Sequence, residues 1–442
     1  MRRVADVLCI SSIDWDFNWQ GHQEIMTAFA KQGHRVLFIE NTGVRNPRIQ
    51  DFQRIRRRLM RWAGTLQGFR REAENLYVYS PLVLPFPYSR IARWVNRRLL
   101  LSPLRRWMEA MDFHHPVLWT FLPTPLTLEI VRAIPHRALV YYCIDSFCDS
   151  TPAARRIVRS EEALLRQSDL VFVTSHSLHE HASRFNPRVY WFPFGVGLPA
   201  FVRAGEFSDH LPEDLASVRR PIVGYVGGIH RWVDQELLIT LARDHPAYSF
   251  VLVGPRQTDT ERLQRESNVF LLGQKPHEEL PHYIQQFDVG LIPYRLTEYT
   301  KNVYPTKLNE YHAMGKPTVS TPLPEVVEFN RQHGNLVRIG STPLEFSQAI
   351  REAIGSDDPR LQEGRRAAAQ ENNWARRIEE MQRLIEKAAH RKGVLPEQDW
   401  VTRFRDSFRG PRRLLRWAAV LALLWAGVFY TPLVWFLTEP LR

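Results

Sequence analysis

Short apolar runs alternate with helical segments along this chain, and the alternation starts twice. Such alternation is typical of parallel α/β sheets, whose strands are joined by covering helices. A loop-like stretch containing Pro199 and Pro212 separates the two series. We therefore expect an α/β fold with two Rossmann-like, doubly wound domains that face a cleft. The expected strands are 4–10, 35–40, 76–79, 117–121, 138–143, 170–174 and 189–192 in the first series, and 222–226, 250–253, 269–272, 289–292 and 318–320 in the second.

The same pattern sets the domain boundaries. We expect an N-terminal domain at residues 1–195, an interdomain linker at 196–220 and a C-terminal domain at 221–372. An amphipathic helix should follow at 373–392, because apolar residues recur there at three- and four-residue steps. Ligands of doubly wound sheets bind beyond the carboxyl ends of the strands, so we expect the chemistry in the cleft between the domains.

The chain is basic, with a formal net charge of +12. Its arginines crowd into residues 45–71, 90–106 and 403–416. Basic clusters of this kind meet either nucleic acid or an anionic membrane surface. No zinc-finger spacing or RNA-binding motif accompanies them, and the third cluster directly precedes an apolar run. We therefore expect a membrane partner and no nucleic acid.

That apolar run, Trp417–Leu437, holds 21 residues without a charge. As a helix it is long enough to cross the hydrocarbon of a bilayer. A buried C-terminal helix is the alternative, but such a helix should show a polar face, and this run has none. The basic segment 393–416 precedes the run, so the positive-inside rule predicts a single-pass C-terminal anchor. The rest of the chain would lie at the cytoplasmic face of the inner or plasma membrane.

Two further stretches, 54–71 and 89–107, mix arginine with large apolar residues at helical spacing. Helices of this composition can lie in the membrane interface with their arginines on the headgroups. The alternative is a basic solvent-facing surface with ordinary core contacts.

Gly227 and Gly228 follow one of the expected strands, and a helix is expected to begin a few residues later. Glycines let the backbone approach a phosphate closely, and a helix N-terminus favours negative charge. Arg231 would add a full positive charge. A tight strand-to-helix turn without a ligand remains the alternative.

The run Pro305–Ser320 has the proline and glycine signals of a helix that begins near Thr306 and ends at Gly315. Lys307 and Glu310 lie three residues apart and therefore on one face of that helix. The lysine could bind a diphosphate, and the carboxylate could accept hydrogen bonds from two ribose hydroxyls. An ordinary salt bridge on the helix surface is the alternative.

The run PTKLNEYHAMGKPTVSTPLPE resembles the signature helix of GT-B glycosyltransferases, particularly the family-4-like enzymes of cell-surface polysaccharide synthesis. VGYVGGIHRWVD, FVLVGP, NVFLLGQKPHEELPHYIQQFDVGLIPY and NNWARRIEEMQRLIE occur in the order typical of that family. WQGHQEIMTAFAKQGHRVLFIENTG, YYCIDSFCD, SDLVFVTSHSLHEH and FPFGVG resemble its N-terminal domain, especially that of teichuronic-acid-type transferases. The resemblance covers about residues 5–390.

The resemblance implies a hexosyltransferase-like enzyme that uses a nucleotide-sugar donor as substrate and needs no cofactor. It implies that Glu310 contacts the donor ribose, that Lys307 or Arg231 contacts the diphosphate, and that the loop Gly273–Pro276 lies near the nucleobase. The family pattern has a glutamate where this chain has Asn302, so the resemblance does not extend to the family's usual donor-sugar contact. Retaining stereochemistry is therefore not assured.

Asp14 and Asp16 imitate the DxD motif of metal-dependent GT-A transferases, but they directly follow the first expected strand. We interpret this segment as an acceptor-side loop, with Asp16, Trp19 and His22 facing the cleft; a metal site is the alternative. Cys143 and Cys148 lack a second Cys/His pair at metal spacing and are interpreted as small core residues. We expect no metal.

Asp145 follows an apolar strand of the N-terminal domain, which would place it at the cleft on the acceptor side. A partly desolvated carboxylate could take the proton of the acceptor hydroxyl, and similar inverting GT-B enzymes use an aspartate of this domain in that way. Capping of the next turn is the alternative, and Asp149 could compete for the role.

These inferences predict transfer of a sugar to a lipid-linked or membrane-proximal glycan acceptor. Two alternatives remain open: a non-catalytic, membrane-tethered scaffold that binds nucleotide sugars, and a nucleotide-sugar epimerase of the same fold.

Overall fold

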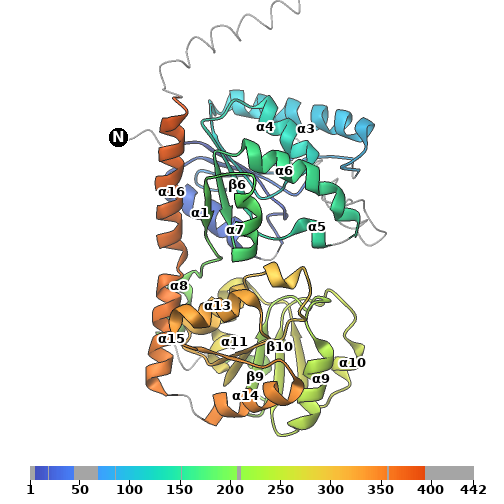
Figure 1. The fold of residues 1–442 in the computed structure, drawn as a ribbon, viewed down its shortest axis with the longest axis vertical. Coiled ribbons are helices and arrows are strands. Elements are labelled where there is room, and N and C mark those ends of the chain that lie inside the picture. Colours follow the sequence, from blue (N-terminus) through green and yellow to red (C-terminus); the bar gives the residue numbers. More distant parts are fainter. Residues whose placement is uncertain are drawn as a thin grey trace, which may run out of the picture. The chain divides into compact units, whose positions relative to one another are not determined.

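The computed structural model describes residues 5–17, 19–43, 68–84, 86–150, 152–206, 211–355 and 358–393 (Figure 1). Two separate sheets form within one compact unit, Met1–Ala388. All strand pairs but one are parallel, and helices connect the strands. The predicted α/β architecture with two doubly wound sheets is confirmed.

The first sheet has the strand order β3-β4-β2-β1-β5-β6-β7-β8. The earlier strands β2, β4 and β3 lie on one side of β1, and the later strands β5 to β8 lie on its other side. The topology therefore switches between β1 and β5. Only the edge strand β3 is antiparallel to its neighbour. The strands are β1 (Val7–Ile10), β2 (Val36–Ile39), β3 (Phe69–Ala73), β4 (Leu76–Tyr79), β5 (Val117–Thr120), β6 (Ala138–Cys143), β7 (Leu170–Val173) and β8 (Val189–Trp191).

Successive residues of each strand point to opposite faces of this sheet, and each face is covered by its own helices. On one face the core includes side chains of α1 (Gly21–Lys31) and of the last helix, α16 (Trp374–Arg391). This helix lies where the amphipathic helix was expected at 373–392. The other face packs against α3 (Arg90–Ala110), α4 (Pro125–Ala133), α6 (Val158–Gln167) and α7 (His176–Ser183).

The second sheet has the order β11-β10-β9-β12-β13-β14, all parallel. Its topology switches between β9 and β12. The strands are β9 (Ile222–Val226), β10 (Ser249–Val253), β11 (Val269–Gly273), β12 (Val289–Ile292), β13 (Thr318–Ser320) and β14 (Val337–Ile339). The helices are α9 (Gln235–Asp244), α10 (Glu261–Gln264), α11 (Leu280–Gln286), α12 (Thr306–Ala313), α13 (Pro324–His333), α14 (Pro343–Gly355) and α15 (Pro359–Glu371).

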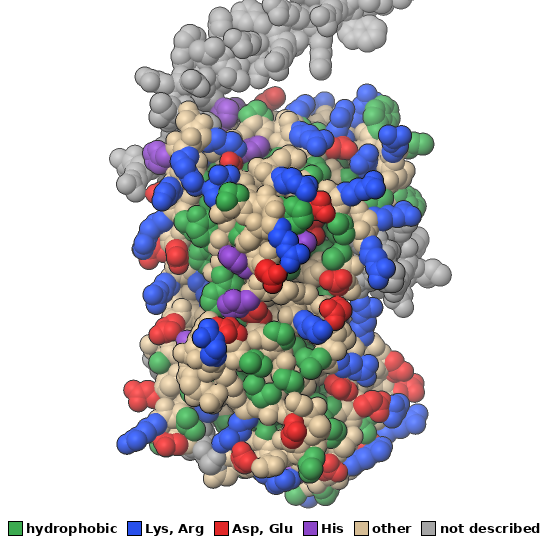
Figure 2. Space-filling model, viewed as in Figure 1, with side chains coloured by type: hydrophobic (Ala, Val, Ile, Leu, Met, Phe, Trp, Pro, Cys, Tyr) green, Lys and Arg blue, Asp and Glu red, His purple; other side chains and the backbone are tan. Residues whose placement is uncertain are grey.

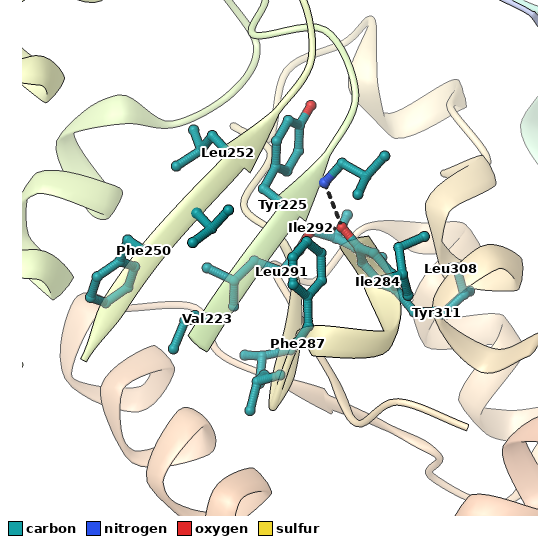
Figure 3. Packing of buried hydrophobic residues seen from close by; sticks show 14 of the residues in the cluster. Val223, Tyr225, Phe250, Leu252, Ile284, Phe287, Leu291, Ile292, Leu308 and Tyr311 are labelled. Atoms are coloured by element: carbon teal, nitrogen blue, oxygen red, sulfur yellow. Dashed lines mark hydrogen bonds between the residues drawn. The ribbon is translucent and has the colours of Figure 1, made fainter. Parts of the chain in front are cut away.

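Tyr311 of α12 fixes this helix at the switch point of the second sheet. Backbone pairing between β9 and β12 extends only to Gly290, beyond which the strands separate. The Tyr311 hydroxyl fills the gap: it accepts a hydrogen bond from Val226 N at 3.0 Å and lies 3.3 Å from Leu291 O (Figure 3). A Cβ on Gly290 would lie 2.5 Å from the Tyr311 ring, so the ring fits because this strand residue is glycine. The contact places the first turn of α12 beside the end of β9.

Two sequence predictions differ from the structure, and a third agrees with it. The linker expected at 196–220 contains a helix, α8 (Leu198–Glu206), and its Phe201 belongs to the core of the second sheet. The end of the basic stretch 54–71 is not helical, because Phe69–Arg71 are part of β3. The expected helix at 89–107 is confirmed as α3.

Within the residues that the structure describes, no helix is long and apolar enough to cross a membrane. The predicted anchor 417–437, residues 394–416 of the basic segment and residues 54–67 lie outside the described residues.

Candidate functional site

Three neighbouring strands of the second sheet end at glycines with positive φ. Gly227, Gly254 and Gly273 have φ of +133°, +153° and +74°, which favour glycine. Gly227 N donates to Val253 O at 2.8 Å, and Gly254 N donates to Gly273 O at 2.8 Å. A Cβ on Gly254 would lie 2.1 Å from Gly227 O, whereas the Cβ direction of Gly273 is open. The carboxyl edge of the sheet is thus a backbone surface that a ligand can approach closely.

Lys307, in the first turn of α12, lies at the switch point of this sheet. Its ammonium group donates a hydrogen bond to the Tyr294 hydroxyl, which follows β12. A Cβ on Gly227, which follows β9, would be 3.6 Å from Lys307 Nζ. The lysine therefore lies between the ends of the two strands that flank the switch point, where ligands of doubly wound sheets bind. Its side chain is almost fully buried, at 5% exposure.

The α12 helix adds to the positive potential at this point. It begins at Thr306 without a side-chain cap, so its first-turn N–H groups retain their dipole. The helix after the Gly227–Gly228 turn differs: it begins at Gln235, and Asp234 caps it by accepting a hydrogen bond from Leu237 N. The anion-binding helix N-terminus expected after the glycine pair is therefore less suitable than that of α12.

Glu310 lies one turn after Lys307 and is partly buried. Burial raises the pKa of its carboxyl, while His277 and Lys307 act in the opposite direction because of their nearby positive charge. His277 begins a 3-10 helix, η4 (His277–Glu279), after β11, and its ring stacks on Trp19 of the first domain with centroids 6.4 Å apart. The predicted donor residue Glu310 and the predicted acceptor-side residue Trp19 thus both neighbour His277.

Arg231 is exposed on the loop between β9 and α9. Burial lowers the pKa of His230 most, followed by the charge of Lys307 and then by that of Arg231. The charge of Arg231 also lowers the pKa of Tyr299, against the larger, raising effect of burial. The structure therefore brings Arg231 toward the group that contains Lys307 and Tyr299.

Asp145 directly follows β6 and contacts the second domain. Its carboxylate accepts a hydrogen bond from Tyr299, in the loop after β12. Burial raises the pKa of the Asp145 carboxyl to about 7, while the Tyr299 hydrogen bond acts in the opposite direction. At neutral pH the carboxyl is therefore poised between its two protonation states. Asp149, the predicted competitor, is exposed and accepts a hydrogen bond from Ser146.

A third contact between the domains joins α7 to α13. The Glu325 carboxylate accepts hydrogen bonds from His176 N at 2.7 Å and from the His176 ring at 3.2 Å. His176 follows β7 and Glu325 follows β13. These three contacts join residues that come after strands, so the carboxyl edges of the two sheets face each other.

Two of the predicted acceptor-side residues have other surroundings than expected. Asp16 is paired with Arg70 at 3.2 Å. His22 is fully buried, its Nε2 lies 2.9 Å from Ser12 Oγ, and its ring packs on Phe121. The prediction that His22 faces the cleft is wrong, because α1 begins at Gly21 and turns this side chain into the interior.

The sequence interpretation missed Tyr294, Tyr299 and His277 as site residues. The signal for Tyr294 was present, since it follows a strand at the switch point. Tyr299 and His277 lie farther from the strand ends, in segments where no periodic pattern indicates which way a side chain points. Among the described residues, no group of three or more His, Cys, Asp or Glu side chains could hold a metal ion.

Residues 220–356, which carry Gly227, Lys307 and Glu310, match the family described as glycosyl transferases group 1. The similarity to this family therefore lies in the second domain. It is also 28% identical over 231 residues to TuaH of Bacillus subtilis (strain 168), a protein named as a teichuronic acid biosynthesis glycosyltransferase. That match covers 50% of this chain and 57% of TuaH, so the chain spans little more than half of this relative's length. The predicted resemblance to GT-B, family-4-like glycosyltransferases is confirmed.

Solved structures share the GT-B fold over most of this chain. Sucrose-phosphate synthase from Thermosynechococcus elongatus has a TM-score of 0.65 at 17% identity, covering 86% of this chain and 98% of that one. A UDP-forming α,α-trehalose-phosphate synthase from Burkholderia vietnamiensis gives 0.62 at 13%, covering 88% and 100%. HepE from Anabaena, in complex with UDP-glucose, gives 0.60 at 14%, covering 88% and 100%. At these identities the likeness shows the fold.

Proposed function

We propose that this chain transfers a sugar from a nucleotide-sugar donor to a lipid-linked or membrane-proximal glycan acceptor in cell-surface polysaccharide synthesis. The observation that carries the proposal is the position of Lys307, between Gly227 and Tyr294 at the switch point of the second sheet. A buried cation beside an open glycine backbone suits a diphosphate, because both the charge and the close approach are already in place.

The donor would lie along the carboxyl edge of the second sheet. Lys307 and Arg231 would neutralise the diphosphate with the dipole of α12, so that no metal ion is required. Glu310 would accept hydrogen bonds from the ribose hydroxyls, and the open backbone at Gly273 would leave room for the nucleobase. Complexes of GT-B neighbours such as HepE contain UDP-glucose, which makes UDP-sugars the first donors to test.

The acceptor would approach from the first domain. Asp145 is the proposed base that takes the proton of the acceptor hydroxyl as the new bond forms. Its pKa of about 7 suits this task, because a base is most effective when its pKa lies near the working pH. In this proposal the reaction inverts the anomeric configuration.

The membrane part of the proposal rests on the sequence outside the described residues. The uncharged run Trp417–Leu437, preceded by arginines, would anchor the chain with its catalytic domains at the cytoplasmic face. Such an anchor would keep the enzyme beside lipid-linked acceptors.

Donor binding and turnover together test the proposal. The full chain in mild detergent is screened by thermal shift against a panel of nucleotide sugars, since a ligand that binds the native state raises its stability. The best donor is then incubated with membrane lipids, and mass spectrometry follows the free nucleotide, the free sugar and the glycosylated lipid. We expect one donor to stabilise the protein and release its nucleotide. Binding without nucleotide release would favour the scaffold, and a changed sugar still attached to its nucleotide would favour an epimerase.

A further inference from the structure

The outer face of α3 and the loop before it carry large apolar side chains exposed to solvent. Ile91 is 76% exposed, Trp94 51% and Leu99 42%. In the preceding loop, Leu84 and Phe86 are 41% and 46% exposed. Single exposed apolar residues are common, but neighbouring ones on one helix and its adjoining loop indicate an interaction surface. We call these five residues the α3 surface.

The α3 surface is held in place from beneath. Asn96, which is buried, donates from Nδ2 to Leu84 O at 2.8 Å and accepts from Leu84 N at 2.6 Å. On the inner side of the helix, Leu100 and Leu104 are fully buried in the core of the first domain. The exposed apolar side chains are therefore displayed by a fixed backbone.

Positive charge surrounds these side chains. Exposed arginines of α3 are interspersed with them, and Figure 2 shows Lys and Arg side chains with hydrophobic ones among them over this helix. The guanidinium of Arg98 lies 3.8 Å from the centroid of the Trp94 ring. Glu109, in the last turn, is the only acidic residue of α3. The exposed arginines of the helix are Arg90, Arg97, Arg98, Arg105 and Arg106.

The loop of the α3 surface lies near the chain segment that follows Asp145. The loop before α3 begins after the carboxyl end of β4 and contains Tyr88. Burial raises the pKa of Tyr88, and the nearby charge of Arg156 lowers it by a smaller amount. Arg156 belongs to the 3-10 helix η2 (Pro152–Ile157), on the segment that leads away from Asp145. The exposed side chains of Arg155, Arg156 and Arg159 extend the positive charge in this direction.

We propose that the α3 surface docks on an anionic lipid bilayer, with Ile91 and Trp94 inserted at the headgroup level and the arginines bound to lipid phosphates. Tryptophan favours the membrane interface, and an arginine can hold its charge at the headgroups while its stem lies on apolar surface. Negative lipids attract such basic surfaces. A protein partner would not require this excess of arginine around the apolar residues. The docking is independent of the sugar chemistry and would orient the first domain toward acceptors in the bilayer.

Site-specific fluorescence on the full chain tests this docking. Ile91→Cys carries an environment-sensitive label, and Leu344→Cys on α14, where the natural leucine is 74% exposed, serves as the matched control. Cys148, the one partly exposed natural cysteine, is changed to serine in both proteins. Each protein is reconstituted into vesicles of phosphatidylcholine alone or mixed with phosphatidylglycerol. We expect a blue shift and a gain in emission at position 91 only, larger on the mixed vesicles, and quenching by lipid-bound quenchers.

Charge reversal tests the role of the arginines. In the double variant Arg98→Glu with Arg105→Glu, the label at position 91 should lose its blue shift and emit as it does in water. In the control pair, Arg219→Glu with Arg360→Glu, the blue shift should be unchanged. Donor binding should be the same in all these variants, so a failure of docking is distinct from a failure of the proposed function. A label at position 91 that responds to vesicles no more than one at position 344 would overturn the docking. An equal response on charged and uncharged vesicles would overturn its dependence on anionic lipid.

Discussion

Asp145, after β6 of the first sheet, accepts a hydrogen bond from Tyr299, after β12 of the second. The two residues lie 154 positions apart in sequence, and their contact joins the carboxyl edges of the two domains. It also gives the proposed base a partner that favours its ionised form. The tyrosine therefore partly offsets the cost of burying the carboxylate.

We predict that Asp145→Asn keeps donor affinity but lowers turnover by about a hundredfold or more, the usual contribution of a general base. Calorimetry of donor binding and steady-state kinetics measure the two effects separately. NMR of the product of the wild-type enzyme gives an independent check, because a base is required for inversion. A retained anomeric configuration, or an Asp145→Asn enzyme near full speed, would remove Asp145 from this role.

Tyr299→Phe should shift the pH dependence of turnover to higher pH. The hydrogen bond from Tyr299 lowers the Asp145 pKa, which is nevertheless about 7 because of burial. Without that bond the pKa rises, so the carboxylate form appears only at higher pH and the ascending limb of the rate profile moves upward. The profile of the first-order rate at saturating donor measures this shift. A limb that stays in place or moves to lower pH would mean that Asp145 is not the titrating base.

Gly254→Ala should weaken donor binding and destabilise the fold by about 1–3 kcal/mol, a typical cost of overpacking. The added Cβ would lie 2.1 Å from Gly227 O, so the turn at Gly227, which lies beside Lys307, has to shift. Gly355→Ala, at a helix end where a Cβ has no neighbour within 4 Å, is the control. Urea unfolding and donor titration compare the stability and the donor affinity of the two variants. Equal stability and equal affinity would show that the turn does not require glycine at position 254.

The full chain should sediment with membranes and resist carbonate extraction. Truncation after Pro396 removes the uncharged run and should leave a protein that high salt releases, because the remaining contacts would be those of arginines with lipid phosphates. Fractionation followed by immunoblotting compares the two forms. A truncated protein that remains in the membrane after both treatments would show that residues 417–437 are not the principal anchor.

The sequence was sufficient for features that depend on local pattern. Most predicted strands match the structure within one residue at each end, because parallel strands buried on both faces appear as short apolar runs. Lys307 and Glu310 were found because proline and glycine mark the two ends of α12. Asp145 was placed at the correct sheet edge by the general rule for strand ends.

Features that depend on long-range contact were not predictable. Tyr299 meets Asp145 only because two domains face each other, and no local spacing encodes that contact. His22 was misplaced because the direction of its side chain depends on where α1 begins, and this helix begins at Gly21. The strand β3 was missed because its sequence, FRREA, has no apolar run; it pairs at the sheet edge, where its side chains are exposed or partly exposed.

Donor affinity of two variants on α12 is the decisive measurement for the donor site. Calorimetry with the best donor is carried out on the wild type, Lys307→Ala, Glu310→Gln and a control pair on the exposed face of α16, Glu386→Gln and Lys387→Ala. Loss of a charge-assisted hydrogen bond costs about 1.5–3 kcal/mol, so each α12 variant should bind the donor roughly ten- to a hundredfold more weakly, with the controls unchanged. Unchanged affinity in both folded α12 variants would contradict the assignment of the donor site.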